Sequence, residues 1–225
     1  MILRSRHSLL TLSAGITACV ALILTTGCST TKVAADRATI EQSKRIAEFT
    51  WRGRPFYDES VGTGAIGAGA SIGNTLFSAA SGKIRNTIQA IYDSGVYQTF
   101  ESDLIRDFSS KLSAPVSKLS ATNYVYSGAG DARRIDVLAS AKAQGYDAVI
   151  EATVWPSLFE RQPDVTQGVN SEAVLKTDIV LKRCADGKVL WKVSYKNASN
   201  SGISSFNKLA QESVATAIKL YSTPK

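Results

Sequence analysis

The chain has 225 residues, of which 44% are hydrophobic, and its formal net charge is +7 at pH 7. This composition is typical of one ordinary globular domain, and it excludes a disordered chain. Lysine and arginine are scattered without a basic run, which argues against nucleic-acid binding. Once the N-terminal segment with the single histidine, His7, is removed, histidine-dependent triads and histidine-ligated metal sites are excluded. We therefore expect a protein that is not an enzyme and that holds no cofactor or metal.

The first 28 residues have the pattern of an export signal that ends at a cysteine. Basic Arg4 and Arg6 precede a mostly apolar run over residues 9–24, and small residues lead to Cys28. This block resembles the lipobox of bacterial lipoproteins, in which the cysteine becomes the acylated N-terminus of the mature chain. The resemblance implies a signal peptide over residues 1–27 and a lipid anchor with palmitate on Cys28.

Two other interpretations of this segment stay open. Cleavage at Cys19 fits the lipobox consensus better, but it leaves an apolar stretch at the mature N-terminus. Alternatively, the 19 uncharged residues 8–26 are just long enough to span a bilayer as an uncleaved helix. After Cys28 we expect a flexible, lipid-anchored tether over residues 28–45. Because Ser29 stands where lipoproteins kept in the inner membrane have aspartate, the resemblance implies the outer membrane, facing the periplasm.

Residues 46–95 are expected to hold a first strand, a glycine-rich segment and a helix. Imperfect alternation of apolar residues over residues 45–51 predicts the strand. Apolar residues at spacings of three to four predict a helix over residues 74–93, which ends at Gly95. The apolar stripe of this helix needs a partner surface.

The glycine-rich segment, residues 60–82, contains no charged residue. It holds the pattern GxGxxG at Gly62, Gly64 and Gly67. A dinucleotide site requires a hydrophobic strand directly before this pattern, and the preceding residues make a poor strand. We therefore interpret the segment as a loop.

A second interpretation of this segment rests on its small residues. Ala65, Gly69 and Gly73 fall four apart, which gives a ridge that lets two helices approach closely. The segment resembles the glycine-zipper stretches of several envelope lipoproteins. That resemblance implies a close helix contact with a partner or within the membrane. It leaves a secretion or pore component as an alternative function.

Residues 96–225 are predicted to form a periplasmic α/β domain. Its first expected elements are a helix with Phe100, Leu104, Phe108 and Leu112 on one face, a strand at 123–126, a helix from an N-cap at Asp131 to Gly145, and a strand at 146–155. This order of helices and strands implies parallel pairing through right-handed crossovers.

A hairpin and a last helix complete the expected domain. Four residues of the first hairpin strand, Leu175, Thr177, Ile179 and Leu181, alternate with polar residues, and Asp186-Gly187 predicts the turn. The residues expected to face inward on the return strand are Val189, Trp191, Val193 and Tyr195. Ser204 or Ser205 is expected to cap the helix that carries Phe206 and Tyr221. Cys184, beside the turn, is interpreted as inert because Arg183 alone is a weak activator of a thiol.

Carboxylate chemistry is the enzymatic alternative that remains, because glycosidase chemistry needs only two acids. The candidate acids are Asp58, Glu59, Glu101, Asp103 and Asp107. We interpret Glu101 and Asp103 as residues at the start of a helix, where acids face the positive end of the helix dipole. A carboxylate-dependent cell-wall enzyme therefore stays an alternative function.

Two segments of the C-terminal half carry a resemblance to known proteins. Residues 141–154 hold a helix end, a glycine, an acid and a strand, and residues 178–191 hold a hairpin that ends in a tryptophan. They resemble the small periplasmic α/β domains of the curli-secretion channel lipoprotein and of lipoproteins that activate cell-wall synthases. The resemblance implies a fold and action through protein partners, and it assigns no binding residue.

Together these patterns predict an α/β protein with a small mixed sheet, in which parallel strands and an antiparallel hairpin pack with helices. We expect a non-enzymatic structural, assembly or regulatory lipoprotein of the cell envelope. Its expected partners are the lipid membrane, through acylated Cys28, and an envelope protein, but no nucleic acid. Homo-oligomerisation stays open.

Overall fold

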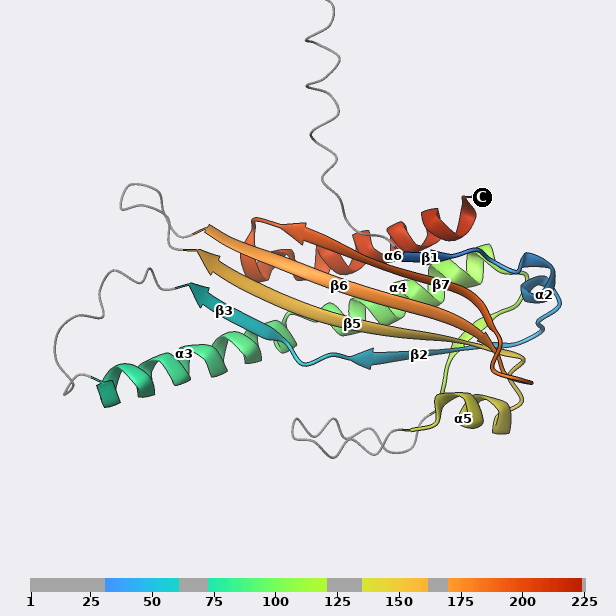
Figure 1. The fold of residues 1–225 in the computed structure, drawn as a ribbon, viewed down its shortest axis with the longest axis horizontal. Helices are drawn as coiled ribbons and strands as arrows, with labels where there is room; N and C mark the ends of the chain where they lie inside the picture. The colour runs from blue at the N-terminus through green and yellow to red at the C-terminus, as the bar shows by residue number, and fades with distance from the viewer. Residues whose placement is uncertain (1–30, 61–72, 121–134, 162–169, 224–225) are drawn as a thin grey trace, which may run out of the picture.

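A computed structural model describes residues 31–60, 73–120, 135–161 and 170–223, and its ribbon is shown in Figure 1. Within these ranges the chain forms a seven-stranded sheet with helices on its faces. In chain order the elements are β1 (Thr31–Val33), α2 (Arg37–Glu41), β2 (Ile46–Arg52), β3 (Phe56–Ser60), α3 (Gly73–Asp93), α4 (Val96–Lys111), β4 (Val116–Lys118), α5 (Val137–Ala143), β5 (Ala148–Arg161), β6 (Asn170–Arg183), β7 (Val189–Ser199) and α6 (Phe206–Ser222).

The strand order is β1-β7-β6-β5-β2-β4, and β3 pairs with the outer part of β5. Strand β2 is parallel to β4 and to β5, whereas β5, β6, β7 and β1 pair antiparallel. The chain is therefore an α/β protein with a mixed sheet, as its sequence predicts. The strand expected at 123–126 falls outside the described residues, and the strands that pair with β5 in parallel are β2 and β3.

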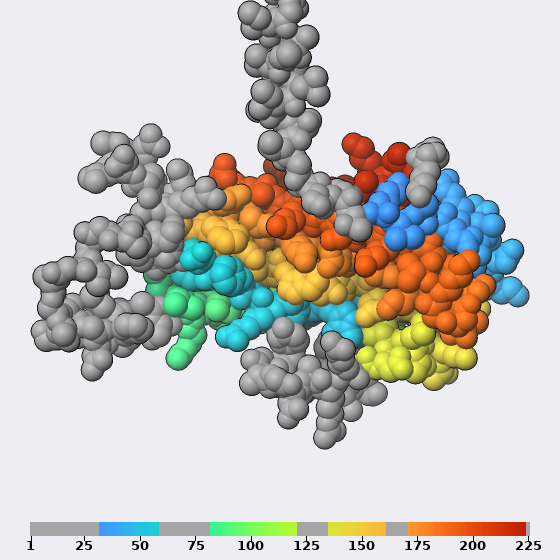
Figure 2. Space-filling view, viewed as in Figure 1, coloured from blue at the N-terminus to red at the C-terminus, as the bar shows by residue number. Residues whose placement is uncertain are grey.

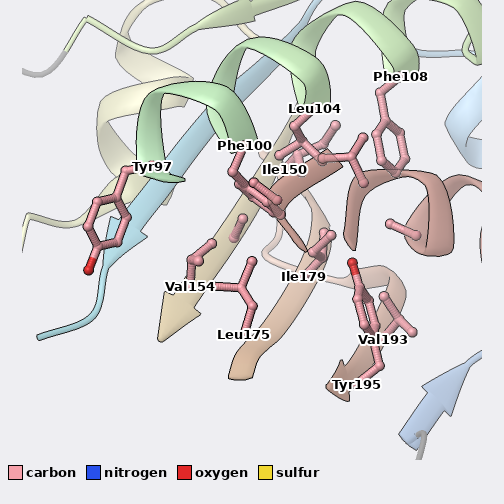
Figure 3. Close-up of a cluster of buried hydrophobic side chains, with 14 of the residues drawn as sticks. Tyr97, Phe100, Leu104, Phe108, Ile150, Val154, Leu175, Ile179, Val193 and Tyr195 are labelled. Carbon is pink, nitrogen blue, oxygen red and sulfur yellow. The ribbon is translucent and has the colours of Figure 1, made fainter. Parts of the chain in front are cut away.

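The main core lies between the sheet and the two helices α4 and α6. Phe100, Leu104 and Phe108 of α4 are fully buried, at the helical spacing expected from the sequence. These side chains point at alternate residues of β5, β6 and β7, as Figure 3 shows. Burial of each such side chain stabilises the fold by roughly 1.5–3 kcal/mol. The residues Phe206, Leu209, Ala210, Val214 and Ala217 of α6 complete this core.

Helix α3 matches the predicted range and only partly enters this core. Ile91 is fully buried, and Ile88 packs against the core. Ile84, one turn earlier, leaves 42% of its surface exposed. The ribbon shows α3 extending away from the sheet (Figure 1).

The opposite face of the sheet is covered at one end by the short helix α5. A small second cluster joins Val137 and Ala141 of α5 to Ala47, Phe49, Leu119, Val149 and Cys184. Over the rest of this face the described residues place no helix, and the strands are visible in Figure 2. We call this surface the open sheet face.

A β-bulge corrects the predicted orientation of one hairpin residue. Trp191 pairs with Leu181 while Val189 pairs with Lys182, so Leu190 is the extra residue of β7. The alternation therefore shifts by one position at the start of the strand. Leu190 is 1% exposed and Val189 is 40% exposed, so the expectation that Val189 faces inward is wrong.

Details of three helix starts are also corrected. Helix α5 begins after Asp136, whose carboxylate accepts from the Ala139 N–H, and not after Asp131, which lies outside the described residues. Ser205 is the N-cap residue of α6, as expected, but its hydroxyl makes no capping bond. It donates to the Gly202 carbonyl within a 3₁₀ turn (Gly202–Ser205) that precedes the helix. Helix α4 begins five residues before Glu101, so the helix-dipole interpretation of Glu101 and Asp103 is wrong.

The expected tether over residues 28–45 contains regular structure. Residues 31–33 form β1 and pair with β7, and residues 37–41 form α2 behind an Asp36 cap. The Asp36 carboxylate accepts from the Thr39 N–H and is paired with Lys188 at 2.8 Å. The folded sheet therefore begins at Thr31 and not near residue 46.

Candidate functional site

A hollow of about 580 Å³ lies on the open sheet face beside α5. We call it the tryptophan groove, because two indoles from neighbouring strands line it. Its lining residues are Trp51, Arg52, Gly53, Ile135, Asp136, Val137, Leu138, Glu151, Thr153, Trp155 and Lys182. Concave, mostly apolar sites with a few polar groups are the usual form of a ligand site.

The groove follows from strand alternation on β2 and β5. Trp51 is paired with Thr153, so both side chains project from the open sheet face, and Trp155 projects two residues further along β5. Gly53 lies beside Trp155: a Cβ there would fall 2.2 Å from Cδ1 of the indole. Glycine at this position is therefore what lets the Trp155 ring lie against the backbone of residue 53.

The backbone of Gly53 is held from two sides. Its N–H donates to the carbonyl of Val154 at 2.8 Å, and its carbonyl accepts from the Tyr97 hydroxyl at 2.5 Å. Tyr97 is itself a buried residue of α4. The wall of the groove is thus fixed by the main core, which makes the site preformed.

A single carboxylate organises the polar side of the groove. Glu151 accepts from Trp51 Nε1 at 2.7 Å through one oxygen and from Lys182 Nζ at 2.5 Å through the other. Lys176 adds a cation 4.7 Å from the centre of the Trp155 ring. With both oxygens engaged, Glu151 orients its neighbours, and the arrangement is suited to binding by ring stacking and hydrogen bonding.

The acids considered for the enzymatic alternative are engaged in ion pairs or stand apart. Glu101 is paired with Arg52 at 2.9 Å and with Lys118 at 2.6 Å, which ties α4 to β2 and β4. Asp103 and Asp107 both pair with Arg106. Asp58 is exposed on β3, and the side chain of Glu59 falls outside the described positions. These acids do not meet in the tryptophan groove.

One buried carboxyl was not predicted from the sequence. Glu48 is fully buried on β2, facing α4, and its Oε1 accepts from the Thr50 hydroxyl at 2.5 Å. No hydrogen-bond partner of its Oε2 lies in the described part of the chain. Burial, opposed by the Thr50 hydrogen bond and reinforced by nearby Glu101, raises the pKa of Glu48 to about 7. The sequence feature that could have indicated its burial is the position of Glu48 two residues after Ile46, on the core side of the strand.

Cys184 is buried, with 4% of its surface exposed. Burial, together with the negative charge of Asp147, raises the pKa of this thiol to about 11. A thiolate is therefore disfavoured at neutral pH, which agrees with the interpretation of Cys184 as an inert residue.

The other predicted site residues lie largely outside the described ranges. Cys28, Ala65 and Gly69 fall there, and Gly73 is the first residue of α3. Among the helices that the structure describes, none is both long and apolar enough to cross a membrane. In the same residues no three His, Cys, Asp or Glu side chains come together as metal ligands.

No protein-family model and no curated protein matches this chain. Solved structures that match the chain include the PelC dodecamer from Paraburkholderia phytofirmans, at 12% identity and TM-score 0.41, covering 88% of this chain and 100% of that one. The hypothetical protein CT253 from Chlamydia trachomatis is 11% identical with TM-score 0.36, over 80% and 98% of the two chains. Lipoprotein GNA1162 from Neisseria meningitidis is 14% identical with TM-score 0.34, over 78% and 98%. Such weak similarities do not indicate what this chain binds.

Proposed function

We propose that the chain is a lipid-anchored, non-enzymatic binding component of the cell envelope, which recognises an envelope partner through the tryptophan groove. The observation that carries this proposal is the preformed groove itself, with two indoles beside Glu151 and Lys182. Both tryptophans are only partly buried, and aromatic side chains left partly exposed in a concave site are typical of binding surfaces. Under this proposal the protein serves as a structural, assembly or regulatory factor of the envelope.

The chemistry of the described acids supports binding over catalysis. Glu101 and Glu151 each accept through both oxygens from donors that include a lysine ammonium, which holds both groups as ion-paired carboxylates. A retaining or inverting glycosidase needs two carboxyl groups that face each other across a bond. In the described residues the groove contains Asp136 and Glu151, and Asp136 caps α5.

The location rests on the sequence. The segment up to Cys28 has the pattern of a lipoprotein signal, and Ser29 favours transfer to the outer membrane. Under this proposal residues 1–27 are removed, Cys28 is acylated, and the domain faces the periplasm.

A photo-reactive residue placed at Thr153, in the groove, tests the proposal in living cells. Irradiation should cross-link a discrete envelope component, which mass spectrometry identifies. The matched control places the same residue at Lys208, which is exposed on α6 on the other side of the sheet. We expect no capture of that component from position 208.

A second variant links the capture to the groove. Trp155→Ala should reduce the Thr153 cross-link at least tenfold, because it removes one wall of the site. Capture of the same species from both positions, or capture that is unchanged by Trp155→Ala, contradicts a specific groove.

A further inference from the structure

The spacing between the anchor and the sheet restricts where the domain sits. Only Ser29 and Thr30 separate Cys28 from Thr31, the first residue of β1. Three residues span at most about 10 Å, since an extended chain advances ~3.3–3.6 Å per residue. If Cys28 is acylated, as the proposed function requires, β1 is held within that distance of the membrane surface.

Strand β1 forms one edge of the sheet. It pairs with β7 alone in the strand order, through residues such as Val33 opposite Lys192. The last helix is tied to the same edge, because Lys32 Nζ donates to the carbonyl of Thr223 at 3.1 Å, just after α6. We call β1, β7 and α6 the anchored edge.

The anchored edge is strongly basic. Its three elements contain five lysines, namely Lys32, Lys192, Lys196, Lys208 and Lys219, and one acid, Glu212. Four of these lysines are exposed, and Val33 exposes 44% of its surface beside Lys192. Anionic phospholipids attract lysines next to a lipid anchor, and each such cation near the membrane surface contributes roughly 1 kcal/mol to the free energy of binding.

The tryptophan groove lies away from this edge. Its two indoles come from β5 and β2, which lie three and four strands away from β1 in the sheet. At about 4.8 Å between neighbouring strands, this places the groove roughly 15–20 Å from β1 across the sheet. We propose that the domain stands on anionic phospholipid by its anchored edge, with the groove held clear of the lipid and open to a partner.

Fluorescence quenching measures this orientation. The acylated chain is reconstituted in vesicles of phosphatidylethanolamine and phosphatidylglycerol that contain a headgroup-nitroxide lipid. A fluorophore on Lys192→Cys should lose at least half of its emission, whereas the same fluorophore on Thr153→Cys should lose little. Equal quenching at the two positions, or none at position 192, overturns the orientation.

A charge substitution tests the basic surface separately from the anchor. In a Cys28→Ser background, Lys192→Gln with Lys219→Gln should weaken binding to the same vesicles about 25-fold, or about fivefold for each lysine. The control pair, Arg85→Gln with Lys142→Gln, removes the same charge from exposed positions on α3 and α5. Equal weakening by both pairs overturns the proposal, because it indicates attraction by net charge alone.

The two proposals fail in different ways. Quenching is read only on protein that carries palmitate, so loss of palmitate at Cys28 would contradict the anchor and not the orientation. Groove capture at Thr153 together with an unquenched label at position 192 would reject the upright orientation and leave the proposed function in place.

Discussion

Glu48 and Thr50 face the same way on β2, and the Thr50 hydroxyl donates to the Glu48 carboxyl at 2.5 Å beneath α4. Glu48 makes stability depend on pH, because burial outweighs the Thr50 hydrogen bond and raises the pKa of this carboxyl from its ordinary 4.5 to about 7. The folded state binds more protons than the unfolded state between these values. The contribution of Glu48 to the unfolding free energy is therefore fully present below pH 4.5. It is lost as the pH rises through 7, and the unfolding free energy falls by about 3 kcal/mol in total.

Glu48→Gln should abolish most of this dependence, since glutamine is neutral at every pH. Urea unfolding at pH 5, 6, 7 and 8 measures it as the slope of the unfolding free energy against pH. Glu212→Gln, at an exposed position of α6, is the control and should leave the slope of the wild type. A Glu48→Gln variant whose free energy still falls with pH would place the titrating group elsewhere.

Trp191→Ala should lower the unfolding free energy by about 3–5 kcal/mol. Trp191 is fully buried, and its ring centre lies 5.7 Å from Phe108 and 5.5 Å from Tyr221, which joins β7 to α4 and α6. Lys192→Ala, on the exposed side of the same strand, should change it by less than about 0.5 kcal/mol. Denaturation midpoints compare the two, and equal midpoints would contradict the observed facing of β7.

Gly53→Ala should close the tryptophan groove. The added methyl group meets the Trp155 indole at 2.2 Å, so the ring must move, at a cost of about 1–3 kcal/mol in stability. Capture from Thr153 should fall with it. Gly82→Ala on α3 is the matched control, because its Cβ meets nothing within 4 Å and alanine favours a helix. Thermal melting and cross-link yield of the two variants test the prediction, and normal yield with Gly53→Ala would count against it.

Cys28→Ser should stop metabolic labelling by palmitate, whereas Cys19→Ser should leave it unchanged. The reason is that the acylated cysteine of a lipoprotein is the first residue of the mature chain. Several acyl chains, at roughly 0.8 kcal/mol per buried methylene, then keep the protein on the membrane. Labelling that survives Cys28→Ser and disappears with Cys19→Ser would reverse the assignment.

Gly69→Leu together with Gly73→Leu tests the glycine-rich segment. If Ala65, Gly69 and Gly73 make a close helix contact, leucine should abolish it, because only small residues let backbones approach. Cross-linking and size in detergent compare the double variant with the wild type. An unchanged profile, with residues 60–82 fully accessible to protease, would favour a loop over a zipper or pore.

The parts of the fold that the sequence predicts are those with a complete local pattern. Phe100, Leu104 and Phe108 repeat at helical spacing, and Leu175 to Leu181 alternate before an Asp-Gly turn, so α4 and the last hairpin follow directly. The bulge at Leu190 breaks the alternation by one residue. A period of two cannot reveal an inserted residue, so Val189 was placed on the wrong face.

The groove was not predictable because it depends on long-range pairing. Trp51 and Trp155 belong to different strands, and the parallel register of β2 and β5 brings them to one face. Glu48 was missed for another reason: glutamate is rarely buried, so its apolar neighbours in β2 were more informative than its own position on the core side. Local propensity does not predict β1 either, because its three residues form a strand only by pairing with β7.

The pairing of β1 with β7 also bears on the order in which the sheet is assembled. Lys32 and Thr223, which meet at the anchored edge, are 191 positions apart in the chain. We expect a contact of such high sequence separation to form late, because nearly the whole chain must first be available. If the chain is exported as proposed, β1 crosses the membrane before the strand with which it pairs. We therefore expect the edge at β1 to be the final part of the sheet to close.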